Sequence, residues 1–238
     1  MSFHAKYELK KALVCVYGQQ TRISDDPSIS YKQALALGAT RGSISQLIVA
    51  SGEGAQGHKL VLPFPRELEY ADGLILNEVG QAGIFQVADC AAIFVYDHTT
   101  GKVAAGHGGR PAMTPPAEHR MCKGCTIVGN LLNYLNSPNV SAIEVLVTGN
   151  ICGSCFVHKG ADDEEQYLQW FRAIPGAVSE DVLGRLNLYR VIEQHFIHAG
   201  VPAENIRHVG PCSLETPGLS SHRRGDKTRN TFIVLKQS

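Results

Sequence analysis

A cysteine and a histidine bracket one short apolar stretch of the chain. Cys90 stands just before the run AAIFVY; the chain then turns at DHTT, returns as KVAA and reaches His107 among glycines. We expect the two apolar runs to pair as a hairpin centred on His98 and Thr99. In that register Cys90 and Ala92 share one face, and His107 lies opposite Ala92. Cys90 and His107 are then diagonal neighbours whose backbone positions lie about 7–8 Å apart. At that separation their side chains are close enough to share a metal ion.

Zinc is the metal that this pair favours. It accepts cysteine sulfur and histidine nitrogen, and a catalytic zinc leaves its fourth position to water or substrate. Such a site needs one more protein ligand, for which His58, at the start of the run KLVLPFP, is a candidate. The glycines around His107 leave the approach open. Copper is less favoured, because a trinuclear copper centre uses His-x-His pairs and none occurs among the ten histidines.

Two Cys-x-x-Cys pairs offer a rival site. Cys122 and Cys125 lie in CKGC, and Cys152 and Cys155 lie in CGSC, which is the spacing of a structural four-cysteine zinc site. The first pair precedes a helical pattern and the second follows a strand, whereas zinc ribbons carry both pairs on short knuckles. If this site forms, the protein is a non-enzymatic, zinc-stabilised binding protein, and that alternative stays open.

A basic segment, SSHRRGDKTRN, precedes the final apolar run. Guanidinium groups bind phosphate through paired hydrogen bonds, so Arg223 and Arg224 are candidates to hold an oxyanion. The competing interpretation is a solvated basic turn. Asp89, beside Cys90, is a candidate general acid, but strand alternation points it away from the metal and favours a structural role.

Short strand-like runs surround these residues, with a few helical patterns placed mainly in the second half. The pattern predicts a single domain over residues 1–238, of mixed α+β class, with a mixed β-sheet and flanking helices. The expected strands are 12–18, 45–52, 58–65, 72–78, 142–151 and 228–236, and the expected helices are 30–39, 119–136, 164–174 and 184–200.

Composition limits the partners. The chain has 238 residues, 44% of them apolar, and no net charge, so neither a nucleic-acid footprint nor a membrane-surface face is expected. No apolar run reaches the roughly 18–20 residues of a membrane span, and the first residues lack a secretory signal. Seven cysteines, an odd number, favour reduced thiols in the cytosol. A small molecule is the expected partner.

These segments together resemble the laccase-domain family of YfiH-like proteins. The family's Ala-Asp-Cys run, hairpin and His-Ala-Gly segment are similar to ADCAAIFVYDHTTGKVAAGHGG, and its Gln-Val-His-Gly is similar to QGHK. Its Gly-Pro-x-Ile-Gly-x-x-Cys resembles TGNICGSC around Cys155, and a later cysteine matches Cys212. Its Tyr-Arg-Arg-Asp-Gly loop resembles HRRGDKTRN. The segments follow family order from about Asp25 to Lys236.

The resemblance implies a zinc ion held by His58, Cys90 and His107. It also implies that the segment SSHRRGDKTRN, called the arginine loop below, forms a wall of a phosphate or substrate pocket. It implies a zinc-dependent purine nucleoside phosphorylase that takes adenosine or inosine and phosphate, with adenosine deamination as a second activity. The family's older name gives polyphenol oxidase as an alternative. One segment departs from the family, because GGRPAM replaces its Trp-Arg and puts Arg110 one place early.

Overall fold

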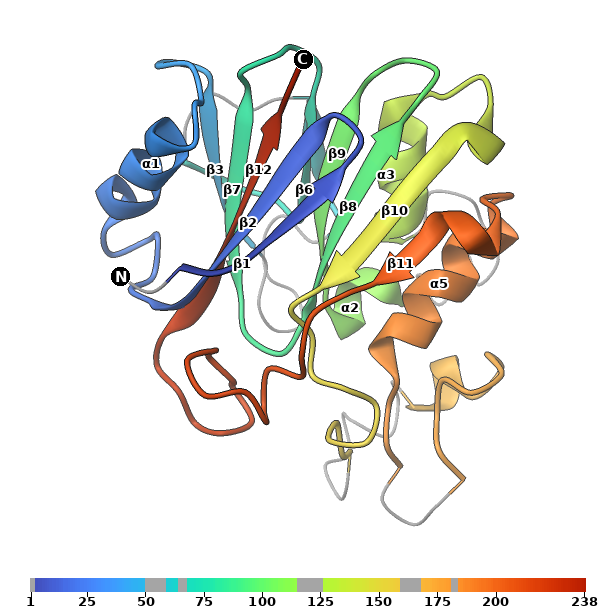
Figure 1. Ribbon diagram of the computed structural model, residues 1–238. Helices are drawn as coiled ribbons and strands as arrows, with labels where there is room; N and C mark the ends of the chain where they lie inside the picture. Colours follow the sequence, from blue (N-terminus) through green and yellow to red (C-terminus); the bar gives the residue numbers. More distant parts are fainter. Residues whose placement is uncertain (1–2, 50–58, 64–67, 115–125, 159–167, 181–183) are drawn as a thin grey trace.

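The computed structural model describes residues 3–49, 59–63, 68–114, 126–158, 168–180 and 184–238. Within these residues, two six-stranded sheets lie face to face and helices cover both outer faces (Figure 1). Each sheet contains parallel and antiparallel pairs. The predicted mixed α+β class with flanking helices is therefore confirmed.

The first sheet is completed by the last strand along the chain. Strand β12 lies between β2 and β7 and is antiparallel to both. Helix α1, Pro27–Ala36, covers the outer face, and Asp26 caps its first turn by accepting from the Ser28 amide. In spatial order the strands are β1 (Phe3–Leu9), β2 (Ala12–Gln20), β12 (Arg229–Lys236), β7 (Ala82–Val87), β3 (Ile44–Ile48) and β5 (Leu68–Tyr70).

The second sheet carries the hairpin expected from the sequence. In spatial order its strands are β11 (Ile206–His208), β10 (Ile143–Thr148), β8 (Ala91–Asp97), β9 (Val103–Gly108), β6 (Gly73–Leu76) and β4 (Val61–Pro63). Its outer face is covered by α2 (Arg110–Met113), α3 (Ile127–Leu135) and α5 (Leu188–His198), and 3-10 turns occupy Val140–Ala142 and Ala203–Asn205. No helix in the described part of the chain is long and apolar enough to cross a membrane.

An aromatic group fills the space between the sheets. The rings of Phe85 and Phe232 from the first sheet and Phe94 from the second have centroids 5.8–6.3 Å apart. All three side chains are almost fully buried, and burying one such ring stabilises a fold by about 1.5–3 kcal/mol. This core fixes the two sheets against each other.

The hairpin has the predicted register, with Ala92 opposite His107. This pairing puts the centre of the hairpin between Thr99 and Thr100, so the expected centre at His98 and Thr99 was one position too early. The reason is local, because the Asp97 carboxylate accepts from the Thr99 amide and the Thr100 hydroxyl and Gly101 adopts a positive φ of 68°. The pairing of Ala92 with His107 was therefore predicted correctly, whereas the residues of the turn were not.

Two helices begin at other residues than the sequence predicted, also for local reasons. The helix expected at 30–39 begins at Pro27, where proline is accommodated in the first turn. The described part of the segment 119–136 becomes helical at Ile127, after the Thr126 cap. Strands β1, β5, β7 and β11 were not predicted, because their runs are short or lack a bounded apolar pattern.

Candidate functional site

Cys90 and His107 meet at one end of the β8–β9 hairpin. His107 is 5% exposed, whereas Cys90 is only partly buried. Ala92 belongs to the core between the sheets, and Cys90 contacts that core, so the pair faces the space between the sheets at its edge. The structure thus brings together two of the three residues expected to bind zinc.

A buried carboxylate orients the imidazole of His107. Asp72 is fully buried, and its Oδ1 lies 2.9 Å from His107 Nδ1. The His107 amide also donates to the Asp72 carbonyl at 2.7 Å. With the Nδ1 proton directed to a carboxylate, Nε2 is the nitrogen that presents a lone pair, as in carboxylate–histidine–zinc arrangements. Sequence reasoning missed Asp72, whose position next to His107 depends on the pairing of β6 with β9.

Gly109 leaves a space between the two donor side chains. A β-carbon at this position would lie 2.8 Å from His107 Nε2 and 3.5 Å from Cys90 Sγ. Gly109 has a φ of −79°, so its backbone does not require glycine. The glycine instead keeps atoms away from the point that the sulfur and the nitrogen both face. Sulfur and nitrogen donors around such a space fit zinc.

Cys90 and Asp72 favour a positive charge at the position of the His107 imidazole. Burial disfavours the charged imidazole, but the electrostatic interaction with Cys90 and the hydrogen bond to Asp72 together raise the pKa of His107 to about 10. Two potential anions therefore face one imidazole. A bound divalent metal would meet the same electrostatic demand as the proton does.

His58 lies outside the described residues, whereas Lys59, which follows it, is among them. The Lys59 amide donates to Asp72 Oδ2 at 2.7 Å, with Lys59 in a left-handed conformation at φ 59°. The Lys59 ammonium donates to the Thr114 carbonyl. Burial lowers the pKa of this ammonium group. One carboxylate, that of Asp72, thus holds both His107 and the residue after His58.

Asp89 fixes the arginine loop beside Cys90. Its Oδ1 accepts from the Ser213 hydroxyl at 2.6 Å, and its Oδ2 accepts from the Ser221 hydroxyl at 3.0 Å and the Arg223 amide at 2.8 Å. The residue is buried and has a positive φ of 70°. Its carboxylate is therefore occupied by the loop, which agrees with the structural role expected from strand alternation.

The two arginines of the loop make different contacts. The Arg223 guanidinium lies over the Phe156 ring at 5.1 Å, and that of Arg110 lies over the same ring at 5.6 Å. The Arg224 guanidinium donates to the Leu214 carbonyl at 2.8 Å and pairs with Asp226 at 2.6 Å. Arg224 thus closes the loop, whereas Arg110 and Arg223 converge on one ring. Sequence reasoning did not place Arg110 there.

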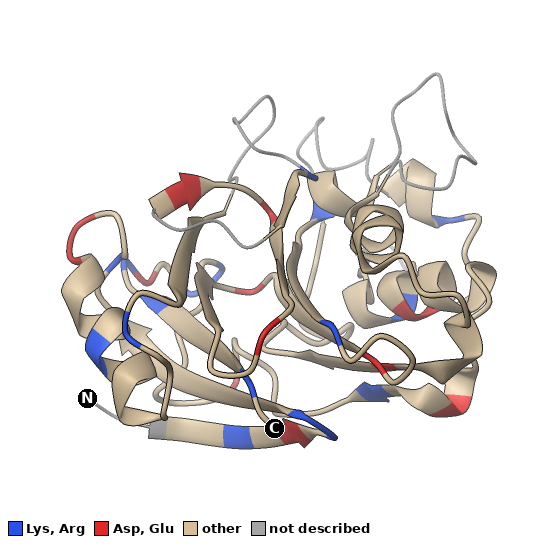
Figure 2. Cartoon of the chain, turned by 90° about the horizontal axis from the view of Figure 1, so that it is seen from above, with Lys and Arg blue, Asp and Glu red and all other residues tan. Residues whose placement is uncertain are grey.

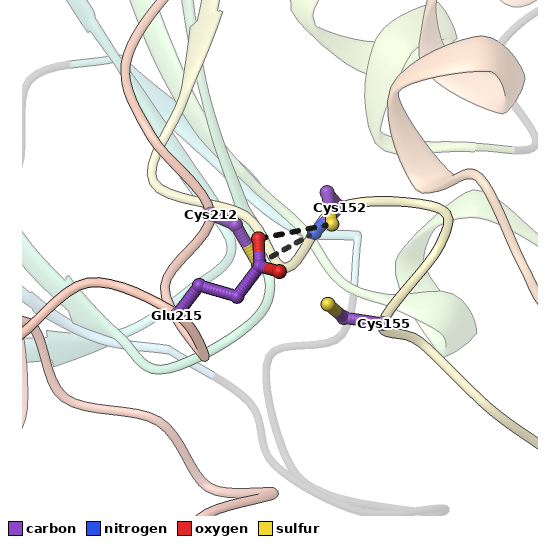
Figure 3. A group of neighbouring side chains, drawn as sticks. All are labelled: Cys152, Cys155, Cys212 and Glu215. Atoms are coloured by element: carbon purple, nitrogen blue, oxygen red, sulfur yellow. Dashed lines mark hydrogen bonds between the residues drawn. The ribbon is translucent and has the colours of Figure 1, made fainter.

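A second group of donors lies on two loops (Figure 3). Ligand atoms of Cys152, Cys155, Cys212 and Glu215 all lie within 4.8 Å of one another. Burial and the neighbouring thiols raise the pKa of Cys155 to about 12. Burial opposes ionisation of Cys152, but hydrogen bonds, led by that with Ser154, lower the pKa of its thiol.

The four-cysteine prediction is met only by its second pair in the part of the chain that the structure describes. Cys152 and Cys155 are joined there by Cys212 and Glu215. Cys122 and Cys125 lie outside the described residues. Sequence reasoning missed Glu215, although Cys212 was matched to a family cysteine.

Charged side chains are otherwise dispersed. Figure 2 shows basic and acidic positions interspersed over the described elements, with no block of one sign. This distribution agrees with the zero net charge of the sequence.

Comparison with known proteins identifies the class of protein that this fold and donor pair define. Residues 32–235 match the family described as multi-copper polyphenol oxidoreductase laccase, and the chain belongs to that family. The family resemblance read from the sequence is thereby confirmed. No curated protein matches the chain.

Solved structures share the fold at low sequence identity. The crystal structure of the hypothetical protein YfiH from Bacillus licheniformis has a TM-score of 0.69 and 17% identity, covering 95% of this chain and 93% of that one. YlmD from Geobacillus stearothermophilus has a TM-score of 0.68 and 18% identity, covering 96% and 93%. A Neisseria meningitidis protein has a TM-score of 0.72 and 14% identity, covering 98% and 99%.

Proposed function

We propose that this protein is a zinc-dependent purine nucleoside phosphorylase that takes adenosine or inosine and phosphate. The observation that carries the proposal is the carboxylate-held His107 facing Cys90 across the space at Gly109. His58 is the third ligand in this proposal, supported by the bond from the Lys59 amide to Asp72. The cytosol is the proposed location, because reducing conditions keep the Cys90 thiol available.

The protein's own groups prepare the site before substrate arrives. Asp72 holds the proton of His107 on Nδ1 and aims Nε2 at the space beside Gly109. Zinc, when bound, supplies Lewis-acid polarisation of an oxygen or nitrogen of the substrate. The buried Asp89 keeps the arginine loop next to Cys90, so the phosphate and the nucleoside meet at one edge of the sheets.

Phosphate binding is assigned to Arg223. In phosphorolysis a phosphate oxygen forms a bond to C1′ of the ribose while the C1′–N9 bond breaks, and the electron pair leaves with the purine. A guanidinium group on the phosphate orients it for this displacement. Of the two arginines expected to bind phosphate, Arg224 is assigned to positioning, since it donates to the Leu214 carbonyl and to Asp226 within the loop.

The test is base release from adenosine, inosine and guanosine by zinc-loaded protein, with and without phosphate. Release of free base and ribose 1-phosphate only when phosphate is present is the expected result. Equal release without phosphate would indicate hydrolysis, and inosine formed from adenosine would reveal the second, deaminating activity. Oxidation of phenols with added copper, together with no base release, would overturn the assignment in favour of a laccase-type reaction. No activity, with loss of folding after zinc removal, would favour the binding-protein alternative.

A loop variant tests the phosphate assignment. Arg223→Ala removes a group that stabilises developing charge, so turnover is expected to fall roughly 10²–10³-fold with zinc content unchanged. Lys227→Ala removes an exposed cation from the same loop and is the matched control. An equal loss in both variants would mean that only the general charge of the loop matters.

A further inference from the structure

Two loops from different parts of the chain bring three thiols and one carboxylate together. Cys152 and Cys155 lie on the turn that follows strand β10, whereas Cys212 and Glu215 lie in the loop that follows β11 (Figure 3). Strands β10 and β11 are parallel neighbours, so their carboxyl ends are at the same edge of the sheet. The donors meet because both loops leave that edge.

The turn presents its two sulfurs in the manner of a metal knuckle. The Cys152 carbonyl accepts from the amides of Cys155 and Phe156, each at 3.1 Å. This tight turn brings the Cys-x-x-Cys side chains to one side. The Cys152 amide donates to Cys212 Sγ at 3.3 Å, and the Ser154 hydroxyl lies 3.0 Å from Cys152 Sγ. Cys152 Sγ also donates to Glu215 Oε2 at 3.8 Å, so Cys152 contacts donors on both loops.

We propose that Cys152, Cys155, Cys212 and Glu215 form a second, structural zinc site. Four protein donors within 4.8 Å of one another match in number the complete ligand set of a closed zinc site. Three sulfurs make the donor set soft, which favours zinc over magnesium, calcium or manganese. Its ligands differ from those of the metal site in the proposed phosphorylase.

The second zinc would hold the loop that carries the arginines. Phe156, directly after Cys155, supports the Arg223 guanidinium at 5.1 Å. On the other side of the site, Ser213 follows Cys212 and binds Asp89, and the carbonyl of Leu214 accepts from Arg224. Every one of these contacts starts within two residues of a proposed ligand. The ion therefore links the turn after β10 to the arginine loop.

Metal analysis of the purified full chain tests the proposal directly. Wild-type protein, dialysed after zinc loading, is expected to hold two zinc equivalents. Cys90→Ala and Cys212→Ala are each expected to hold one, and Glu215→Gln is expected to release its second zinc at a lower chelator concentration than wild type. Cys15→Ala removes a buried thiol from the first sheet and is the matched control, with both equivalents retained.

A spectroscopic measurement separates the two sites without using activity. In Cys90→Ala protein loaded with cobalt, thiolate-to-cobalt charge-transfer absorption arises only from the proposed second site, and the further change Cys212→Ala should reduce it strongly. Limited proteolysis of the loops should accelerate in parallel. Because Glu215 is exposed, Glu215→Gln tests the site even if a cysteine variant fails to fold.

Three outcomes would overturn the proposal. The first is retention of both zinc equivalents by Cys212→Ala, and the second is a folded Cys90→Ala protein that holds no metal. The third is loss of the second zinc in Cys122→Ser or Cys125→Ser while Glu215→Gln binds zinc as tightly as wild type. That result would show that a cysteine of the first pair, and not Glu215, is the fourth ligand.

Discussion

The two donor clusters differ in what holds them. Cys90 and His107 sit at the ends of paired strands, and Asp72 orients the imidazole from within the core. Cys152, Cys155 and Cys212 sit on loops, and the fourth donor, Glu215, is exposed. The paired strands therefore hold the first cluster in place. In the second cluster the bound metal would hold the loops in place.

That difference matches the chemistry proposed for each. A catalytic metal needs a vacant coordination position and rigidly held ligands, and Gly109 provides space beside a strand-borne pair. A structural metal needs a complete set of protein ligands, which four donors can supply. Variants that separate metal retention, stability and turnover can therefore break or sharpen the comparison.

The largest effect is expected from Gly109→Ala. Its new methyl group would lie 2.8 Å from His107 Nε2, so the space for metal is filled and turnover should fall by more than about 10²-fold. Zinc content should drop by one equivalent while the second cluster keeps its metal. Gly108→Ala is the control, because its methyl group faces Ile93 and Ile192 and should lower thermal stability but not zinc content. Full zinc retention in Gly109→Ala would place the catalytic metal elsewhere.

Asp72→Asn should have the next largest effect. It removes the negative charge that orients His107 while keeping a side chain of similar shape, so zinc affinity at the first cluster should fall about 10–100-fold. Competition with a chromogenic chelator measures this change. The affinity of the second cluster should stay the same, and a parallel loss at both clusters would contradict their independence.

Asp89→Asn probes the connection between the clusters. The amide cannot accept all three hydrogen bonds from Ser213, Ser221 and Arg223 as well as a carboxylate does. The free energy of unfolding should fall by about 1–3 kcal/mol, measured by urea denaturation. The KM for phosphate should rise while zinc content remains constant. An unchanged KM would show that the loop does not contribute to phosphate binding.

The smallest effect is expected from Phe156→Leu. Losing the ring beneath Arg223 removes a cation–π contact worth about 0.5–1 kcal/mol, so the KM for phosphate should rise only about two- to fivefold. Phe171→Leu makes the same change in the same buried cluster and is the control. Equal kinetic effects in both variants would assign the loss to the core rather than to Arg223.

Local alternation was enough to predict the hairpin and the pairing of Ala92 with His107, although not the residues of its turn. Because side chains alternate along a strand, the positions of Cys90 and His107 relative to Ala92 followed from the two apolar runs alone. The same alternation predicted that Asp89 points away from the metal and has a structural role. These inferences needed no knowledge of the rest of the sheet.

Residues contributed by distant segments were beyond that reasoning. Asp72 reaches His107 through the pairing of β6 with β9, and Glu215 reaches Cys152 through the parallel pairing of β10 with β11. Strand patterns show that a strand exists but do not name its neighbour. Strand β7 was not predicted for the same reason, because it is recognisable mainly by its position beside β12.

The central position of β12 has a consequence for biogenesis. Strands β2 and β7 emerge from the ribosome more than a hundred residues before the strand that joins them, since Val14 and Gly83 both pair with Val234. Until then two apolar edges stay open to pairing with other chains, a state that favours aggregation. The arginine loop immediately precedes β12, so the nascent chain acquires its proposed phosphate-binding residues only just before the strand that joins β2 to β7.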